Sequence, residues 1–209
     1  DSKWCVAIVA DINSQPKDIY ISDLGYSGDR LIFLGPEEQE HLYPDLSKAI
    51  PWRHYGRKNV GYIFAIQHGA ELIWDFDDTN QGLFDINIIR NQNNIRVLKR
   101  CKGSYKFFNP YPYFGAEESY IWPRGFPLHF VRDTATTPVL CTTNIPVNTI
   151  GVIQSTANIE PDVDAIFRLM RPRSLTFEAK KTFPFISVPR FSYCPFNAYA
   201  TLWTKSSFL

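Results

Sequence analysis

The sequence predicts an α/β fold with a mainly parallel central sheet. Two apolar runs rich in β-branched residues, WCVAIVA at 4–10 and RLIFL at 30–34, are typical of strands buried on both faces. A helical pattern follows at 57–68, and a further apolar run follows at 71–75. Strand, helix and strand at this spacing form a βαβ unit, and ligands of such sheets lie beyond the carboxyl ends of the strands.

The helix boundaries follow from proline and glycine. Pro36 stands after the second apolar run and before EEQEHL, which predicts a short helix with proline in its first turn. Val60, Ile63 and Phe64 form one stripe of the next helix, and Gly69 is a natural C-terminal cap. Further along, we expect strands at 94–99 and 150–154 and a short helix at 162–170.

Aromatic residues crowd into one part of the chain. The sequence has 16 Phe, 11 Tyr and 5 Trp, and they gather between Tyr105 and Phe130 among several prolines. Proline at that density blocks regular helices and central strands. We therefore expect a long aromatic-lined loop region with its own packing.

Composition limits the classes of protein to consider. The 209 residues suit one domain, or two small ones, and 22 basic against 21 acidic residues leave a charge of +1. That balance gives no reason to expect a nucleic-acid partner. The four cysteines form no C-x-x-C, which excludes zinc ribbons and thioredoxin-like motifs and leaves disulfides open. No apolar run approaches the ~18 residues of a membrane span, so we expect the chain as given to be soluble.

Three carboxylates follow the apolar run that ends near residue 75. Asp75, Asp77 and Asp78 belong to DFDD, and carboxylate oxygens are the ligands that Mg²⁺ or Mn²⁺ prefers. Acids that face water or cap a following helix explain the stretch equally simply. The stretch also resembles the D-x-D-x-T of haloacid-dehalogenase-type phosphatases, with Asp75 as nucleophile and Asp77 as acid/base. In that family, however, the motif opens the domain, whereas 74 residues precede it here.

Two cations open the helix at 57–68. Arg57 and Lys58 stand where the helix dipole disfavours positive charge, which suggests a compensating partner. A bound phosphate or diphosphate would use both side chains. The simpler alternative is that both side chains extend into solvent or toward nearby acidic residues. Asp11 stands at the end of the first strand, on the edge where ligands of such sheets lie.

Three charged residues stand among or beyond the aromatic residues. Arg124 and Arg132 bracket RGFPLHFVR, where an arginine can stack on an aromatic ring or clamp an anion. Asp164 belongs to PDVDA, where a helix begins, so capping by aspartate is the default explanation for Asp162 and Asp164. Either carboxylate could instead act as a base or bind a sugar hydroxyl.

Four segments carry a resemblance to a known family. GRKNVGYIFAIQHGAELIWDFDD, NPYPYFG, WPRGFPL and PDVDAIFRL occur in this order, and the chain resembles the STELLO proteins from about Trp4 to Trp203. Those are plant Golgi glycosyltransferase-like proteins, and they in turn resemble the reversibly glycosylated polypeptides, which include UDP-arabinopyranose mutases. The resemblance implies one GT-A-like (Rossmann-like) nucleotide-diphospho-sugar transferase domain over residues 1–209, without the family's C-terminal segment and membrane anchor. It also implies a place in the Golgi lumen.

The resemblance assigns roles to the candidate residues. Asp75, Asp77 and Asp78 would form a D-x-D-type metal site for Mn²⁺ or Mg²⁺, and Arg57 and Lys58 would neutralise the diphosphate of a UDP-sugar donor. Asp11 would face the uridine or ribose. The aromatic stretch would hold the sugar, with Arg124 near its phosphate or hydroxyls. Asp164 would be a carboxylate on the side of the acceptor, a glycan or a protein, and Arg132 would correspond to the arginine that becomes glycosylated in the mutase relatives.

Three functions remain open at this point. The first is a metal-dependent glycosyltransferase. The second is a phosphatase with Asp75 as nucleophile. The third is a scaffold or binding module that keeps the fold without catalysis.

Overall fold

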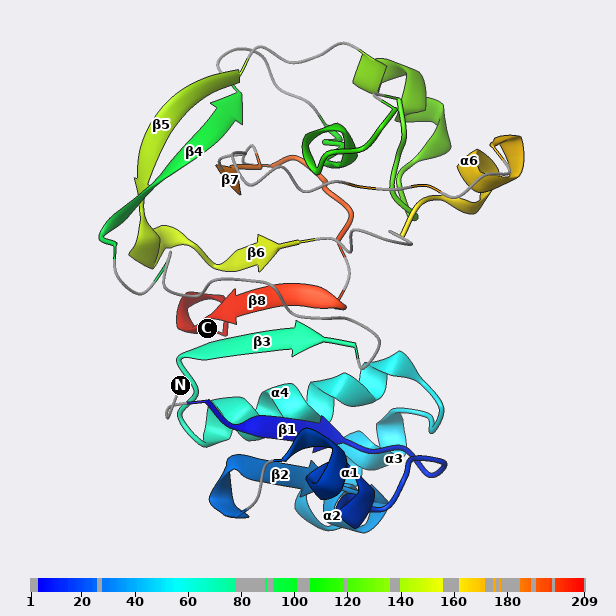
Figure 1. The fold of residues 1–209 in the computed structure, drawn as a ribbon, viewed down its shortest axis with the longest axis vertical. Helices are drawn as coiled ribbons and strands as arrows, with labels where there is room; N and C mark the ends of the chain where they lie inside the picture. The colour runs from blue at the N-terminus through cyan, green and yellow to red at the C-terminus, as the bar shows by residue number, and fades with distance from the viewer. Residues whose placement is uncertain are drawn as a thin grey trace. The chain divides into compact units, whose positions relative to one another are not determined.

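A computed structural model describes residues 4–25, 28–77, 89, 92–100, 106–118, 120–135, 140–155, 162–171, 175, 177, 185–188, 191–196 and 198–208. The chain divides into two compact units, unit 1 (Asp1–Ile73) and unit 2 (Trp74–Leu209) (Figure 1). The expectation of one domain over residues 1–209 stays a prediction.

Unit 1 is built on two parallel strands. β1 (Val6–Val9) pairs with β2 (Leu31–Leu34), and Val6 lies opposite Leu31. α1 (Lys17–Leu24) connects the two strands, and after β2 come α2 (Pro36–Leu42), α3 (Pro44–Ala49) and α4 (Lys58–Gln67). The predicted strands at 4–10 and 30–34 and the two predicted helices are therefore confirmed, but the helix of the parallel β1–α1–β2 unit is α1 and not the helix at 57–68.

Glycine explains how α4 lies against β1 and where it ends. A Cβ atom on Gly61 would stand 2.7 Å from Cγ2 of Val9, so the helix approaches the strand more closely than an alanine would allow. Val60 beside it is fully buried. After the helix, Gly69 adopts a φ of 78° and its N–H donates to the Ile66 carbonyl. The predicted C-terminal cap is confirmed.

Unit 2 contains two three-stranded sheets. One has the order β3–β8–β6, with β3 at Leu72–Phe76, β8 at Ala200–Thr204 and β6 at Val152–Gln154. The last three residues of β3 open unit 2. The other sheet has the order β5–β4–β7, with β5 at Leu140–Pro146, β4 at Asn94–Arg100 and β7 at Phe185–Ile186.

The expected mainly parallel sheet is not confirmed. β4 pairs with β5 and β6 pairs with β8 in antiparallel fashion, whereas β4 pairs with the short β7 in parallel. Parallel neighbours need a crossover, usually a helix, and among the described residues strands and helices alternate in that way only in unit 1. The predicted strands at 94–99 and 150–154 are nevertheless present as β4 and β6.

The core of unit 2 is aromatic and comes largely from the predicted loop region. α6 (Ala165–Met170) buries Phe167 against the Trp122 ring, with 5.0 Å between ring centroids. The buried members of this cluster are Tyr111, Ile121, Trp122, Phe126, Val163, Phe167, Leu175 and Phe177. The prediction of a loop region with its own packing is confirmed.

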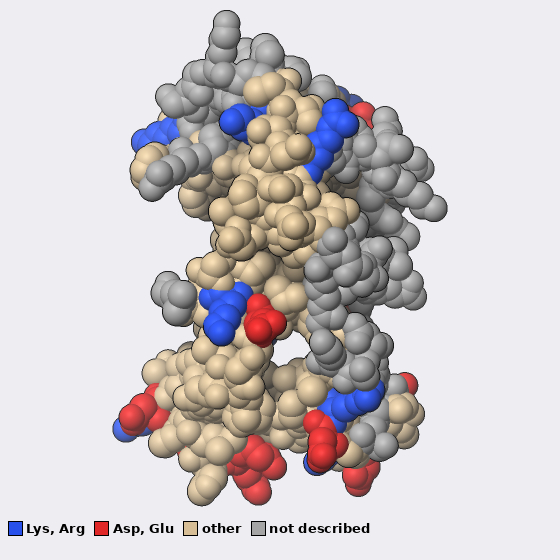
Figure 2. All heavy atoms as spheres, turned by 90° about the vertical axis from the view of Figure 1, so that its left-hand side faces the viewer, with Lys and Arg blue, Asp and Glu red and all other residues tan. Residues whose placement is uncertain are grey.

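Charged side chains are spread over the surface. On the face drawn in Figure 2, the basic and acidic side chains of the described residues lie in small separate groups and form no broad patch of one sign. This agrees with the small net charge of the sequence.

Candidate functional site

The carboxyl ends of β1 and β2 are tied together by one buried glutamine. The side-chain amide of Gln39 donates to the Ala10 carbonyl at 2.6 Å and to the Leu34 carbonyl at 2.7 Å. Gln39 is fully buried in α2. This side chain fixes the edge of the strand pair where a ligand of such a fold would be expected. A glutamine in a run of acids gives no signal for such a role in the sequence.

Arg57 is held from inside unit 1. Its guanidinium donates from Nε to Gln39 Oε1 at 3.0 Å, from Nη1 to the carbonyls of Ser47 at 2.9 Å and Ile50 at 2.8 Å, and from Nη2 to Ser47 Oγ at 2.9 Å. It also stacks on the Trp52 ring, with 3.5 Å from Cζ to the ring centroid. Only 4% of the residue is exposed. A direct contact of Arg57 with a diphosphate stays a prediction, and four of its five N–H groups are already used internally.

The surroundings of Arg57 act on its charge in opposite directions. Burial lowers the pKa of the guanidinium, and the negative charges of Asp11 and Glu40 partly offset this effect. The Ser47 and Ile50 carbonyls lie at the C-terminal end of α3, where the helix dipole favours a cation. The compensating partner expected from the sequence is therefore the end of another helix.

Asp11 joins two loops at the same edge. Its carboxylate accepts the backbone N–H of Ile12 and the backbone N–H of Arg53, each at 2.7 Å. Arg53 has a φ of 58°, a conformation that a side chain other than glycine seldom adopts, and its guanidinium lies against the Asn13 amide. Lys58 follows as the half-buried first residue of α4. Asp11 and Lys58 thus both belong to unit 1, and their predicted ligand contacts stay predictions.

The acidic stretch begins inside a strand rather than after it. Asp75 is the fourth residue of β3 and only 7% exposed, whereas Phe76 is 47% exposed and Asp77 is half-buried. β3 ends at Phe76, so Asp77 is the first residue beyond the strand. Asp78 lies outside the described residues. Across the ranges that the structure describes, no three His, Cys, Asp or Glu side chains gather to hold a metal ion.

Arg124 and Asp164 lie on the two segments of one short bridge in unit 2. Pro123 and Val163 form an isolated antiparallel bridge, with the Arg124 N–H donating to the Asp162 carbonyl at 2.9 Å. Nη2 of Arg124 lies 2.9 Å from Oδ2 of Asp162. Asp164, two residues further, caps α6 by accepting the Ile166 N–H at 2.9 Å. The structure therefore gives Arg124 the neighbouring Asp162 as its partner and places Asp164 at the start of α6.

Asp162 is fixed by a buried tyrosine as well. The Tyr111 hydroxyl donates to the Asp162 carbonyl at 2.7 Å. Burial, with the nearby Tyr199 and Asp162, raises the pKa of Tyr111 far above its ordinary value, so the hydroxyl stays protonated and donates. Asn109 accepts the Tyr111 N–H and donates to the Ile121 carbonyl. These contacts connect the NPYPYFG, WPRGFPL and PDVDAIFRL segments.

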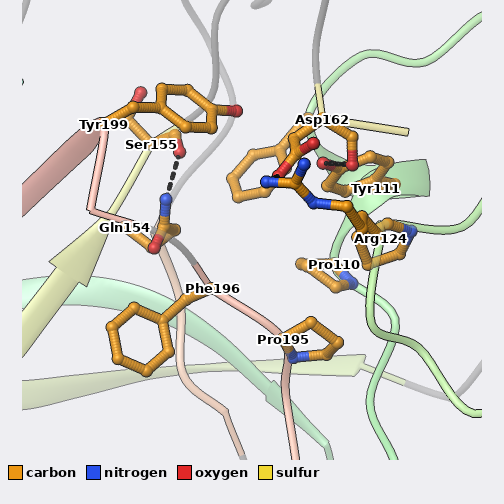
Figure 3. Close-up of a pocket in the computed structure, with 11 residues that line it drawn as sticks. Pro110, Tyr111, Arg124, Gln154, Ser155, Asp162, Pro195, Phe196 and Tyr199 are labelled. Carbon is orange, nitrogen blue, oxygen red and sulfur yellow. Dashed lines mark hydrogen bonds and ion pairs between the residues drawn. The ribbon is translucent and has the colours of Figure 1, made fainter. Parts of the chain in front are cut away.

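A small pocket opens beside this ion pair (Figure 3). In the close-up the Arg124 guanidinium points between Asp162 on one side and Gln154 on the other, and Phe196 and Tyr199 lie across from it. The pocket has a volume of about 30 Å³. The residues around it are Pro110, Tyr111, Phe114, Pro123, Arg124, Gln154, Ser155, Asp162, Pro195, Phe196 and Tyr199. All of them belong to unit 2.

Several residues around this pocket carry no functional signal in the sequence. Gln154 and Ser155 follow a strand pattern, and Phe196 and Tyr199 stand in the CPFNAYA segment near the C-terminal end of the chain. The predicted sugar-holding stretch at 105–130 contributes mainly to the core, because Phe108, Trp122 and Phe126 are each at most 5% exposed. Arg132 lies in the 3-10 helix Leu128–Ala135, and its side chain is outside what the structure describes.

The cysteines differ in oxidation state. Cys141 is disulfide-bonded, whereas Cys5 and Cys194 are free thiols. Burial raises the pKa of Cys194 to about 12. Among the helices of the described ranges, none has the length and apolar character needed to cross a membrane.

Comparison with known proteins gives one consistent relationship. No protein-family model matches the chain. Two curated proteins of Arabidopsis thaliana, named probable glycosyltransferase STELLO1 and probable glycosyltransferase STELLO2, are each 30% identical to it, over 190 and 192 residues. The matches cover 85% of this chain and 24% of each relative. The chain therefore spans about a quarter of the length of these relatives.

Proposed function

This chain belongs to the STELLO-like family, and from that premise we propose that it is part of a glycosyltransferase that uses a UDP-sugar donor on a GT-A-type fold. The observation that carries the proposal is the convergence of three motif segments on one pocket in unit 2, where Arg124 is paired with Asp162 next to Asp164. The parallel β1–β2 pair, with Asp11 just beyond the end of β1, supports the nucleotide-binding part of the proposal.

In unit 2, the acidic residues at the end of β3 would hold a divalent cation for the donor's diphosphate. Asp75, Asp77 and Asp78 would supply carboxylate oxygens, the ligand type that Mn²⁺ or Mg²⁺ prefers. A divalent cation there would neutralise charge on the departing nucleotide diphosphate. In unit 1, Lys58 in the first turn of α4 stays a candidate for a phosphate contact. We assign Arg57 a supporting role, since it holds α2, α3 and the start of α4 together.

The acceptor would be met by residues of unit 2. Asp164 would be the carboxylate that takes a proton from an acceptor hydroxyl, and its position as the helix cap keeps its side chain oriented. Arg124 would bind hydroxyls beside it. Arg132 stays a candidate for a contact with the transferred sugar.

The phosphatase alternative fits the structure less well. A nucleophile toward phosphate must be open to its substrate, and Asp75 is 7% exposed within β3. A phosphatase would also act without a nucleotide sugar. A binding module without catalysis would bind UDP without transferring a sugar.

We propose a secretory lumen, such as that of the Golgi, as the place of action. Disulfides persist in oxidising compartments and are rare in the cytosol. Cys141 is disulfide-bonded, which supports this location.

Calorimetric titration of UDP with and without Mn²⁺ tests the proposal. We expect UDP binding that depends on Mn²⁺ in the wild type and is lost in Asp77→Ala. Asp23→Ala is the matched control, because Asp23 is an exposed carboxylate on α1. Absence of Mn²⁺-dependent UDP binding by the intact wild-type protein would refute the transferase proposal, whereas binding without transfer to any acceptor would indicate the binding module.

A further inference from the structure

An exposed aromatic ring stands at the mouth of the unit 2 pocket. Phe196 is 57% exposed, yet its ring is held edge-on by Trp203, with 5.7 Å between ring centroids. The preceding Pro195 is buried and anchors the loop. A rigid ring with a free face is the kind of surface on which the apolar face of a sugar ring stacks, since little conformational entropy is lost on binding.

The charge of the pocket disfavours an anion. Nη2 of Arg124 lies 2.9 Å from Oδ2 of Asp162, so the two charges nearly cancel. For an anion ~4 Å from the guanidinium and ~6 Å from the carboxylate, roughly two thirds of the attraction is removed by the repulsion, because Coulomb energy falls as 1/r. A neutral, hydroxyl-rich ligand instead gains from both groups, since hydroxyls donate to carboxylates and accept from guanidinium N–H groups.

The size of the pocket fixes which part of a ligand enters it. A volume of about 30 Å³ holds about two waters and is too small for a sugar ring. One or two hydroxyl groups can enter between Arg124 and Gln154 while the ring stays outside on Phe196 (Figure 3). Gln154 is kept in place by its own bonds, since its amide donates to the Ser155 carbonyl and its oxygen accepts from Thr201.

We infer that this pocket binds one pyranose ring of a neutral acceptor saccharide, with the ring on Phe196 and its hydroxyls read by Asp162 and Arg124. The inference rests on the proposed glycosyl transfer and names the acceptor class of the same site. The donor is a poorer candidate for this pocket, because a nucleotide diphosphate carries negative charge and the ion pair is neutral overall. Tyr199 flanks the ring position from the same loop region.

Saturation-transfer NMR with cellohexaose, maltohexaose and mannohexaose, and with inorganic phosphate as a separate probe, tests the inference. We expect at least one of the three saccharides to bind the wild type and phosphate not to bind at the same concentration. Phe196→Ala should weaken saccharide binding about tenfold, the value of one aromatic contact. Phe191→Ala is the matched control, because Phe191 is 91% exposed a few residues before Phe196 and does not line the pocket.

Removal of the Asp162 charge should change saccharide binding and phosphate binding in opposite directions. Asp162→Asn leaves Arg124 without its countercharge, so saccharide binding should fall and phosphate binding should appear. Binding of phosphate but no saccharide by the wild type would overturn the inference, as would equal losses in Phe196→Ala and Phe191→Ala. Mn²⁺-dependent UDP binding is measured on the same samples. If UDP binds and no saccharide binds, this inference alone is refuted. If a saccharide binds and UDP does not, the proposed transferase is refuted.

Discussion

Replacement of Arg57 by alanine is expected to destabilise unit 1 strongly. The guanidinium makes four internal hydrogen bonds and one cation–π contact at 4% exposure. At about 1.5–3 kcal/mol for each hydrogen bond from a charged group, the four contribute about 6–12 kcal/mol. Several kcal/mol of this offset the cost of burying the cation. The net loss in the free energy of unfolding should therefore be about 3–5 kcal/mol, a large part of the stability of a small domain.

Urea denaturation followed by tryptophan fluorescence measures this loss, and Trp52 under the guanidinium reports on the same region. Arg57→Lys keeps the charge but not the planar fork, so it should lose most of the same free energy. Arg53→Ala is the matched control, since Arg53 is exposed and its change should cost about 1 kcal/mol or less. A loss below 1 kcal/mol in Arg57→Ala, together with weaker Mn²⁺-dependent UDP binding, would refute the supporting role and make Arg57 a ligand contact.

Four further outcomes follow from single residues. Asp164→Ala should lower the free energy of unfolding, measured in urea, by about 1 kcal/mol because the α6 cap is lost. Asp164→Asn keeps the cap. Loss of sugar transfer at unchanged stability in Asp164→Asn would therefore identify a chemical role of the carboxylate. Tyr111→Phe should cost about 1 kcal/mol in the same assay by removing the hydrogen bond to Asp162, and an unchanged midpoint would contradict this. At pH 8, iodoacetamide should label the exposed Cys5 well before Cys194, whose pKa is raised to about 12, and equal rates by mass spectrometry would be inconsistent with that burial. Because the unfolded Cys194 thiol releases its proton first, the unfolding free energy should also fall between about pH 9 and pH 12.

Local patterns were enough to place most helices and strands. Pro36 opens α2 at its first turn, and Gly69 ends α4 in the left-handed conformation, because these requirements concern neighbouring residues. The pairing of strands joins residues far apart in sequence. β8 lies between β3 and β6 although the chain reaches it last, and no periodicity carries that information.

The candidate residues also divide into those that local patterns identify and those that depend on contacts between distant parts of the chain. Arg57 violates a local rule at the start of α4, and from the sequence a phosphate is as good an explanation as any. The acceptors that resolve the conflict, the Ser47 and Ile50 carbonyls, are backbone groups that any residue at those positions would present. Arg124 was found because it stands in a motif, whereas Phe196 stands outside every motif and becomes a candidate only through its place at the pocket.

Proline explains why Arg124 faces Asp162 and not Asp164. Pro123 has no N–H, so in an antiparallel bridge it can only occupy a pair whose own N–H groups are not used. The hydrogen bonds of the bridge therefore come from the flanking residues, and the observed bonds are Arg124 N–H to the Asp162 carbonyl and Asp164 N–H to the Trp122 carbonyl. This register places Arg124 and Asp162 directly opposite each other, where the side chains can pair. Asp164, two pairs further along and opposite Trp122, caps α6, so the register at Pro123 leaves Asp162 as the carboxylate that neutralises the arginine.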